Sequence, residues 1–154
     1  MTLSVGDKAP NFSMSADGGG EVSLVNLRGQ SVVLYFYPKD DTPGCTTEAC
    51  GFRDAMPNFS SADVAIVGVS KDTVAKHEKF KAKHYLNFTL GSDADGSVCE
   101  AYGTWVEKSM YGRTYMGIER ATFLIDHRGV LRRIWRKVKV KGHVQEVLDA
   151  VKTL

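Results

Sequence analysis

The chain has 154 residues, 43% hydrophobic and 25% charged, which fits one globular domain, 1–154, with a sizeable core. Its net charge of +2 is too small to indicate nucleic-acid binding, and no apolar run approaches the ~20 residues that span a bilayer. The N-terminus also lacks the basic start and the apolar run of a signal peptide. We therefore expect a cytoplasmic protein with neither a nucleic-acid nor a membrane partner.

Taken in chain order, the turns and apolar runs predict a sheet. The glycines at 18–20, followed by a short strand at 21–24, predict an N-terminal β-hairpin, and 28–30 reads as a second turn. Buried strands are predicted at 32–37, 64–69 and 121–125, where apolar, largely β-branched runs suit a sheet covered on both faces. The turn at 126–129 joins the last of them to 130–135 as an antiparallel hairpin at a sheet edge.

Helices are predicted between these strands. They span about 45–59, 73–84, 97–102 and 143–154. Ser97 and Glu100 have the spacing of a capping box at the start of the third helix. Alternating strands and helices followed by a hairpin predict a mixed α/β sandwich with helices on both sides of a central sheet.

Basic residues and histidines carry no specific signal. The basic cluster is interpreted as a solvated edge strand and not as a binding patch: Arg128, Arg132, Arg133, Arg136, Lys137, Lys139 and Lys141. His77, His84, His127 and His143 are scattered without metal-ligand spacing. We expect these histidines at the surface or partly buried in helices and turns.

The three cysteines are more informative. An odd number in a chain without an export signal argues against a structural disulfide framework and leaves metal binding or catalysis. Four residues separate Cys45 from Cys50, and no histidine lies near them in the sequence, so a zinc site is not favoured.

Cys45 follows a strand and a short loop and stands at the start of a predicted helix. Unpaired N–H groups and the positive end of the helix dipole stabilise negative charge there, so we expect a thiolate. Helical spacing places Cys45 on the inward stripe formed by Ala49, Phe52, Met56 and Phe59, which predicts a sulfur at the bottom of a pocket open to small reagents. The hydroxyl of Thr42, three residues earlier, can donate to the thiolate or to a bound oxygen.

Cys50 lies five positions after Cys45, about 140° around an ideal helix, with the two Cα atoms about 8.6 Å apart. A disulfide rarely tolerates more than ~7 Å, so pairing of the two requires the first helical turns to unwind. The alternative is that both are inert core cysteines, because free cysteine is often buried.

Several longer stretches resemble one family. The pattern Pro38-x-x-x-Thr42-x-x-Cys45 resembles the active-site signature of the peroxiredoxins, and nearly the whole chain is similar to their bacterioferritin comigratory protein (PrxQ) branch. The similar stretches are 36–39, 42–46, 48–54, 112–118 and 120–126. The resemblance implies a thioredoxin-like fold, here with the N-terminal β-hairpin that the glycines at 18–20 predict.

Residue roles follow from that resemblance. Cys45 resembles the peroxidatic cysteine, Thr42 the hydroxyl that orients the peroxide, and Pro38 the proline that shields the pocket. Arg120 resembles the guanidinium that stabilises the thiolate, and Cys50 the resolving cysteine of members that keep it in the same helix. Without the resemblance, Arg120 would be one charge among many before a buried strand.

The implied reaction is reduction of hydrogen peroxide and organic hydroperoxides through a cysteine sulfenic acid. An intramolecular disulfide then forms and is reduced by thioredoxin or a similar dithiol. This chemistry needs no metal, haem or flavin, and serves antioxidant defence and redox homeostasis. The branch also implies a monomer.

Two other functions remain open on the same scaffold. A thiol–disulfide oxidoreductase is disfavoured because that class usually carries Cys-x-x-Cys. A redox-sensing protein or holdase chaperone is a non-enzymatic alternative, since a fold does not fix a function.

Cys99 and an aromatic-rich stretch complete the candidates. Cys99 is expected to be structural, with an alternate resolving thiol as the other interpretation. Core and loop packing is expected for Tyr102, Trp105, Met110, Tyr111, Tyr115 and Met116, and the alternative is an apolar collar that favours organic hydroperoxides.

Overall fold

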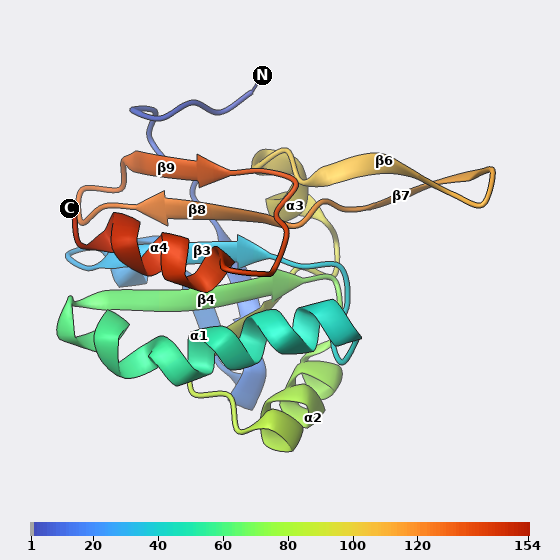
Figure 1. The fold of residues 1–154 in the computed structure, drawn as a ribbon, viewed down its shortest axis with the longest axis horizontal. Coiled ribbons are helices and arrows are strands. Elements are labelled where there is room, and N and C mark those ends of the chain that lie inside the picture. Colours follow the sequence, from blue (N-terminus) through green and yellow to red (C-terminus); the bar gives the residue numbers. More distant parts are fainter. Residues whose placement is uncertain (1) are drawn as a thin grey trace.

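The computed structural model describes residues 2–154 (Figure 1). In this range the strands are β1 (Ser13–Ala16), β2 (Glu21–Ser23), β3 (Ser31–Phe36), β4 (Val64–Ser70), β5 (Thr89–Ser92), β6 (Trp105–Met110), β7 (Arg113–Ile118), β8 (Ala121–Ile125) and β9 (Leu131–Trp135). The α-helices are α1 (Pro43–Ser61), α2 (Val74–His84), α3 (Ser97–Ala101) and α4 (His143–Val151). Two 3₁₀ turns, η1 (Asp17–Gly19) and η2 (Val25–Leu27), follow β1 and β2.

A mixed seven-stranded sheet forms the centre, in the order β2-β1-β5-β4-β3-β8-β9. Strands β3, β4 and β5 run parallel, whereas β8 and β9 extend the sheet antiparallel on one side and β1 and β2 on the other. Val33 and Leu34 of β3 are fully buried although they point to opposite faces, as expected for a strand covered on both sides. The predicted mixed sheet, the N-terminal hairpin and the edge hairpin are confirmed.

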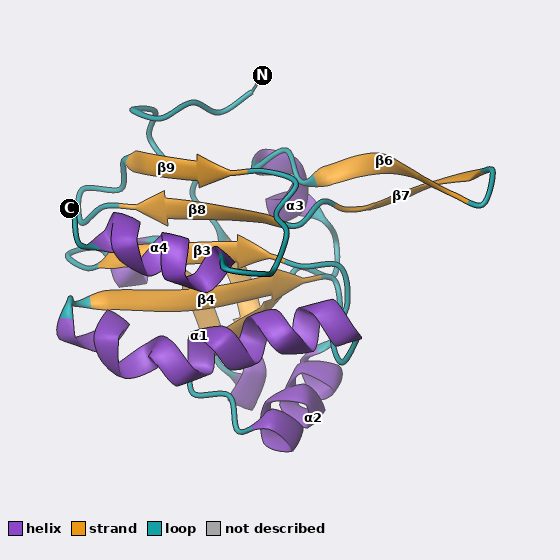
Figure 2. Cartoon of the chain, in the orientation of Figure 1, coloured by secondary structure: helices purple, strands orange, loops and turns teal. Residues whose placement is uncertain are grey.

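Two apolar layers fill the space on either side of the sheet. Helices α1 and α4 contact each other and cover one face, where Phe52, Phe59 and Val147 are buried (Figure 2). The other face is covered by α3 and by residues of the N-terminal segment, with Phe12 and Tyr102 among the buried side chains. Helices therefore flank both faces, as in a thioredoxin-like fold.

The four predicted helices are present, with two corrections. Helix α4 ends at Val151, and Leu154 is 44% exposed, because the chain leaves the helix before reaching that position. The capping box at Ser97 is wrong: Gly96 is the N-cap of α3. The buried carboxylate of Asp93 instead accepts from the N–H groups of Val98 and Cys99.

The aromatic-rich stretch differs most from expectation. Apart from the buried Tyr102, it forms a separate two-stranded sheet, β6–β7, which projects from the body of the protein (Figure 1). Tyr111 at its tip is 97% exposed, and Met110, Tyr115 and Met116 are each about half exposed. Core packing is therefore wrong for these four residues, because the strands pair only with each other and leave the four side chains in solvent. Trp105 at the base of the hairpin is half-buried and packs against the core, as expected.

Two histidines are buried where surface or partly buried positions were expected. His77 of α2 is completely buried, and His143 at the start of α4 is nearly so. Each has polar partners that offset the cost of burial: Asp40 and Gly91 for His77, and the Thr122 hydroxyl for His143. Among the helices of residues 2–154, none is both long and apolar enough to cross a membrane.

Candidate active site

The site begins where β3 ends and α1 starts. Thr42 is the extended N-cap residue of α1, and Pro43 occupies the first helical position, where a missing N–H costs nothing. The first helical hydrogen bond runs from the N–H of Thr46 to the carbonyl of Thr42, at 2.8 Å. Cys45 thus precedes the first residue that donates within the helix, so its own N–H lies at the positive end of the helix dipole.

Arg120 contacts the Cys45 sulfur. Its Nη2 donates to Sγ at 3.3 Å. The sheet explains this meeting of distant residues, because Phe36 at the end of β3 pairs with Ala121 at the start of β8. Arg120 therefore reaches the loop between β3 and α1. Gly44 leaves room for it, since a Cβ there would lie 3.2 Å from Nη2.

Glu48 is a member of this cluster that the sequence reasoning missed. Its Oε1 accepts from Nη1 of Arg120 at 2.7 Å, and its side chain is completely buried. Burial raises the pKa of Glu48 to about 7, against the opposing charge and hydrogen bond of Arg120. A carboxylate one turn after Cys45, on the inward stripe of the predicted helix, was the signal that could have identified it.

Cys45 itself is only 1% exposed and packs in the core layer with Ala49 and Phe52. The inward orientation predicted from helical spacing is therefore confirmed. A hollow of about 350 Å³ lies beside the site, between Pro38 and the base of the β6–β7 hairpin, although Cys45 does not line it. An oxidant that reaches the sulfur must therefore be small or must displace neighbouring side chains.

Thr42 and Pro38 lie in the segment that joins β3 to Cys45. The Thr42 hydroxyl donates to the carbonyl of Lys39 at 2.9 Å and not to the sulfur. Pro38 is exposed at the bend that follows β3 and lines the hollow. The structure thus brings Arg120 into contact with Cys45 and places Pro38 and Thr42 on the preceding loop.

Cys50 and Cys99 differ sharply in position. All three cysteines are unpaired, and Cys50 is half-buried on the same helix as Cys45. Cys99 is fully buried in the layer on the opposite side of the sheet. Burial, together with the hydrogen bond and charge of Asp93, raises the pKa of the Cys99 thiol. This environment favours the structural interpretation of Cys99.

A buried histidine anchors the loop that precedes α1. His77 Nδ1 lies 2.6 Å from Oδ2 of Asp40, and Nε2 lies 2.9 Å from the carbonyl of Gly91. Because both partners accept hydrogen bonds, both ring nitrogens donate and the ring is cationic. Burial lowers the pKa of His77, but the hydrogen bond and charge of Asp40 outweigh it and raise the pKa overall. Asp40 also accepts a hydrogen bond from the hydroxyl of Tyr37 at 2.6 Å. Its carboxylate is therefore held by both His77 and Tyr37.

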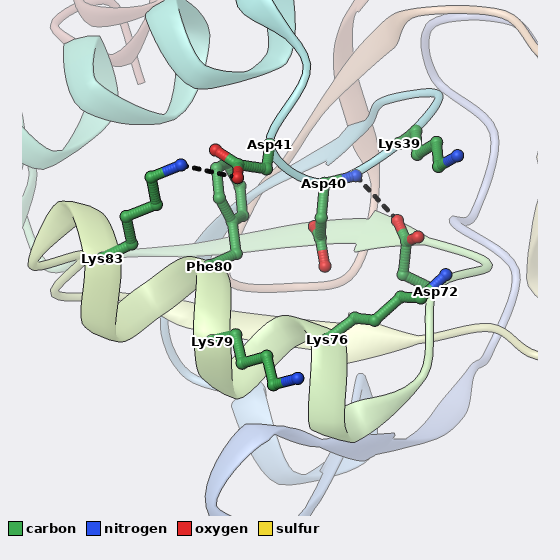
Figure 3. A pocket seen from close by; sticks show the side chains of 8 residues that line it. All are labelled: Lys39, Asp40, Asp41, Asp72, Lys76, Lys79, Phe80 and Lys83. Atoms are coloured by element: carbon green, nitrogen blue, oxygen red, sulfur yellow. Dashed lines mark hydrogen bonds and ion pairs between the residues drawn. The ribbon is translucent and has the colours of Figure 1, made fainter.

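The same loop faces helix α2 across a hollow of about 220 Å³ (Figure 3). The main-chain N–H of Asp40 donates to Asp72, and Lys83 donates to Asp41 (Figure 3). Asp40, Asp72 and His77 place ligand-type atoms within 4.8 Å of one another. A cation there would have to break the His77–Asp40 hydrogen bond in a hollow lined by lysines, so we interpret the group as an anchor for the loop.

His143 gives a pH dependence of stability. Burial and then the charge of Arg120 lower the pKa of His143 to about 4. The unfolded chain binds this proton near pH 6.5, so between about 6.5 and 4 it holds more protons than the folded protein, and stability falls as the pH falls. We expect His143→Gln to reduce this loss by up to about 3 kcal/mol, measured by urea unfolding at pH 7, 5.5 and 4.5. The control is His127→Gln at an exposed position, and equal pH slopes for the two variants would contradict the assignment.

Comparison with known proteins agrees with this geometry. The model of the AhpC/TSA family matches residues 5–134, and the chain belongs to that family. Peroxiredoxin Bcp of Bacillus subtilis is 51% identical over 100% of the chain and 98% of its own length. Peroxiredoxin Bcp of Escherichia coli K12 is 46% identical over 97% of the chain and 96% of its own.

A solved structure extends the similarity to three dimensions. This structure of the Xanthomonas campestris bacterioferritin comigratory protein comes from a study of its alkyl peroxide reduction activity, and it matches with a TM-score of 0.88. That protein is 45% identical, with 92% of the chain and 90% of its own covered. The predicted membership of the Bcp (PrxQ) branch of the peroxiredoxins, which are thiol peroxidases, is confirmed.

Proposed function

We propose that Cys45 is the peroxidatic thiol and Cys50 the resolving thiol of this peroxidase. The observation that carries the proposal is the contact between Arg120 and the Cys45 sulfur at the start of α1. A guanidinium and a helix N-terminus together stabilise a thiolate, the form of cysteine that attacks oxygen. We further propose that residues 1–154 act as one thioredoxin-like domain.

In the first step the Cys45 thiolate attacks the terminal oxygen of a hydroperoxide, ROOH. The sulfur–oxygen bond forms as the O–O bond breaks, so the sulfur is oxidised to a sulfenic acid and RO⁻ leaves and takes a proton. Arg120 and the N–H groups at the start of α1 stabilise the charge on both oxygens. Thr42 orients the peroxide, for which its hydroxyl must leave the Lys39 carbonyl, and Pro38 shields the site. The substrates are hydrogen peroxide and alkyl hydroperoxides.

In the second step the Cys50 thiolate attacks the sulfenic sulfur, hydroxide leaves and takes a proton to become water, and a Cys45–Cys50 disulfide forms. The spacing of the two residues on α1 requires its first turns to unwind for this step. Half-burial of Cys50 favours that movement over one that would carry Cys99 across the sheet. A thioredoxin-type dithiol then reduces the disulfide by exchange.

The cellular setting is also a proposal. We place the protein in the cytoplasm as a monomer that serves antioxidant defence and uses no metal, haem or flavin. The chemistry above supports the cofactor-free part of this proposal, because two thiols, a hydroperoxide and a dithiol balance the reaction by themselves.

Separate cysteine variants test the assignment of the resolving thiol. With one equivalent of hydroperoxide, Cys50→Ser is expected to consume the oxidant once at the wild-type rate and to accumulate the Cys45 sulfenic acid. Its thioredoxin-dependent turnover is expected to fall to background, whereas Cys99→Ser keeps wild-type turnover. A steady-state assay coupled to thioredoxin reductase measures both, and loss of recycling in Cys99→Ser alone would overturn the assignment.

A further inference from the structure

The hollow beside Pro38 combines apolar walls with basic groups. Trp105, Tyr115 and Met116 of the β6–β7 hairpin line it, together with the lysines Lys39, Lys71 and Lys108. Its volume of about 350 Å³ lies within the usual range of small-molecule pockets. Pro38 and Lys39 of the loop before Cys45 form part of its wall, so a ligand held there contacts the loop that leads to the site.

Lys108 of β6 lines this hollow, and its side chain passes over the neighbouring strand β7. Most of the hairpin is exposed, but Lys108 is half-buried. Its stem crosses Gly117 of the neighbouring strand, where an added Cβ would lie 3.2 Å from Cδ. Burial and the charge of Arg120 lower the pKa of Lys108, and negative charge at Cys45 and at Glu119 opposes this. The ammonium group thus lies within the electrostatic field of the Cys45–Arg120 pair.

Lys71 is positioned at the same hollow by an aromatic ring. Its Nζ lies 4.1 Å from the centre of the Trp105 ring, a cation–π contact that holds the charge at the wall. Within residues 2–154, none of Lys39, Lys71 and Lys108 has a carboxylate within 4 Å. Three cations without a close counter-charge, beside apolar walls, match a ligand with a carbon body and an anionic group.

We propose that Lys108, with Lys39 and Lys71 beside it, binds the carboxylate of an organic hydroperoxide whose carbon body contacts Trp105 and Tyr115. This inference rests on the proposed function and specifies its substrate as a hydroperoxide that bears a carboxylate. Lys108 is in this account a specificity-determining residue. It favours anionic hydroperoxides over neutral ones and takes no part in breaking the O–O bond.

A matched pair of substrates tests this role. A hydroperoxy carboxylic acid, its methyl ester and hydrogen peroxide are each reduced by the full-length wild type, Lys108→Met, Lys108→Arg and a control, Lys152→Met. Lys152 is exposed beside the C-terminus, which Figure 1 places at the opposite end of the molecule from the hairpin. Stopped-flow measurement of the first oxidation gives the rate constant without any contribution from the reductant.

Lys108→Met is expected to lower the rate constant for the acid about five- to tenfold, with less than a twofold change for the ester and for hydrogen peroxide. Lys108→Arg and Lys152→Met are expected to stay within about twofold of wild type for the acid, and added salt to reduce the acid-to-ester ratio of the wild type. Equal losses for all three substrates, or no loss for the acid, would overturn the proposal. The proposed peroxidase function is tested separately, because it requires only that the wild-type protein reduces hydrogen peroxide, whichever result Lys108→Met gives.

Discussion

Replacing Cys45 by serine is expected to abolish hydroperoxide turnover. A serine hydroxyl is not ionised near neutral pH and is a poor nucleophile without an adjacent general base. Arg120 stabilises an anion but cannot accept the proton of an alcohol. The rate of peroxide consumption by Cys45→Ser should therefore equal that of buffer, measured with thioredoxin or another dithiol in excess.

The fold of this variant is expected to be intact, because serine is close to cysteine in size and Arg120 can still donate to its oxygen. Its circular dichroism spectrum and its urea midpoint show whether this holds. Cys99→Ser is the matched control, since it changes a cysteine buried on the other face of the sheet. Residual turnover in Cys45→Ser above the buffer rate would show that another thiol carries the reaction.

Removing the guanidinium of Arg120 should have the second largest effect. Arg120→Met is expected to lower the rate constant for hydroperoxide reduction about 10²- to 10³-fold, the usual cost of removing one donor from a charge-stabilising site. The loss arises because Arg120 is the one side chain of residues 2–154 that donates a hydrogen bond to the Cys45 sulfur. Single-turnover kinetics measure it directly.

The Arg120→Met experiment needs controls for Glu48, because Arg120 is the ion-pair partner of this buried carboxyl group. Without Arg120 its buried carboxyl loses its partner, but a pKa already raised to about 7 allows it to become neutral by binding a proton. Arg120→Met/Glu48→Gln removes the remaining charge and separates lost stability from lost chemistry. Arg120→Lys is expected to recover only part of the activity, because one ammonium does not reproduce the fork that contacts both Glu48 and Cys45. Wild-type rates in Arg120→Met would contradict the account.

The nucleophile could be predicted from sequence because its signals are local. A strand, the Thr42-Pro43-Gly44 turn and the apolar stripe of the next helix identify the start of that helix and the face on which Cys45 lies. Thiolate chemistry also calls for a cation beside the sulfur, because a nearby positive charge lowers the pKa of a thiol. Its identity came only from family resemblance, because the contact depends on the pairing of Phe36 with Ala121 across 85 residues of chain.

The parts that sequence reasoning missed depend on tertiary context. Glu48 was not singled out, because its role depends on an ion pair with Arg120, which lies 72 residues further along the chain. His77 carried no sign of burial, since its partner Asp40 lies in a loop far away in sequence. Strand β5 is four residues long, so it lacks the long apolar run that reveals a buried strand. Hairpin β6–β7 was missed because its aromatic residues are typical of a core.

Peptide mass spectrometry of the reduced protein after a single equivalent of hydrogen peroxide shows directly which sulfur is oxidised and which one resolves it. We predict that one species dominates, with the peptide containing Cys45 linked to its own Cys50 and with Cys99 still a free thiol. Consumption of the oxidant with Cys45 recovered unmodified would contradict the assignment of this residue as the attacking sulfur.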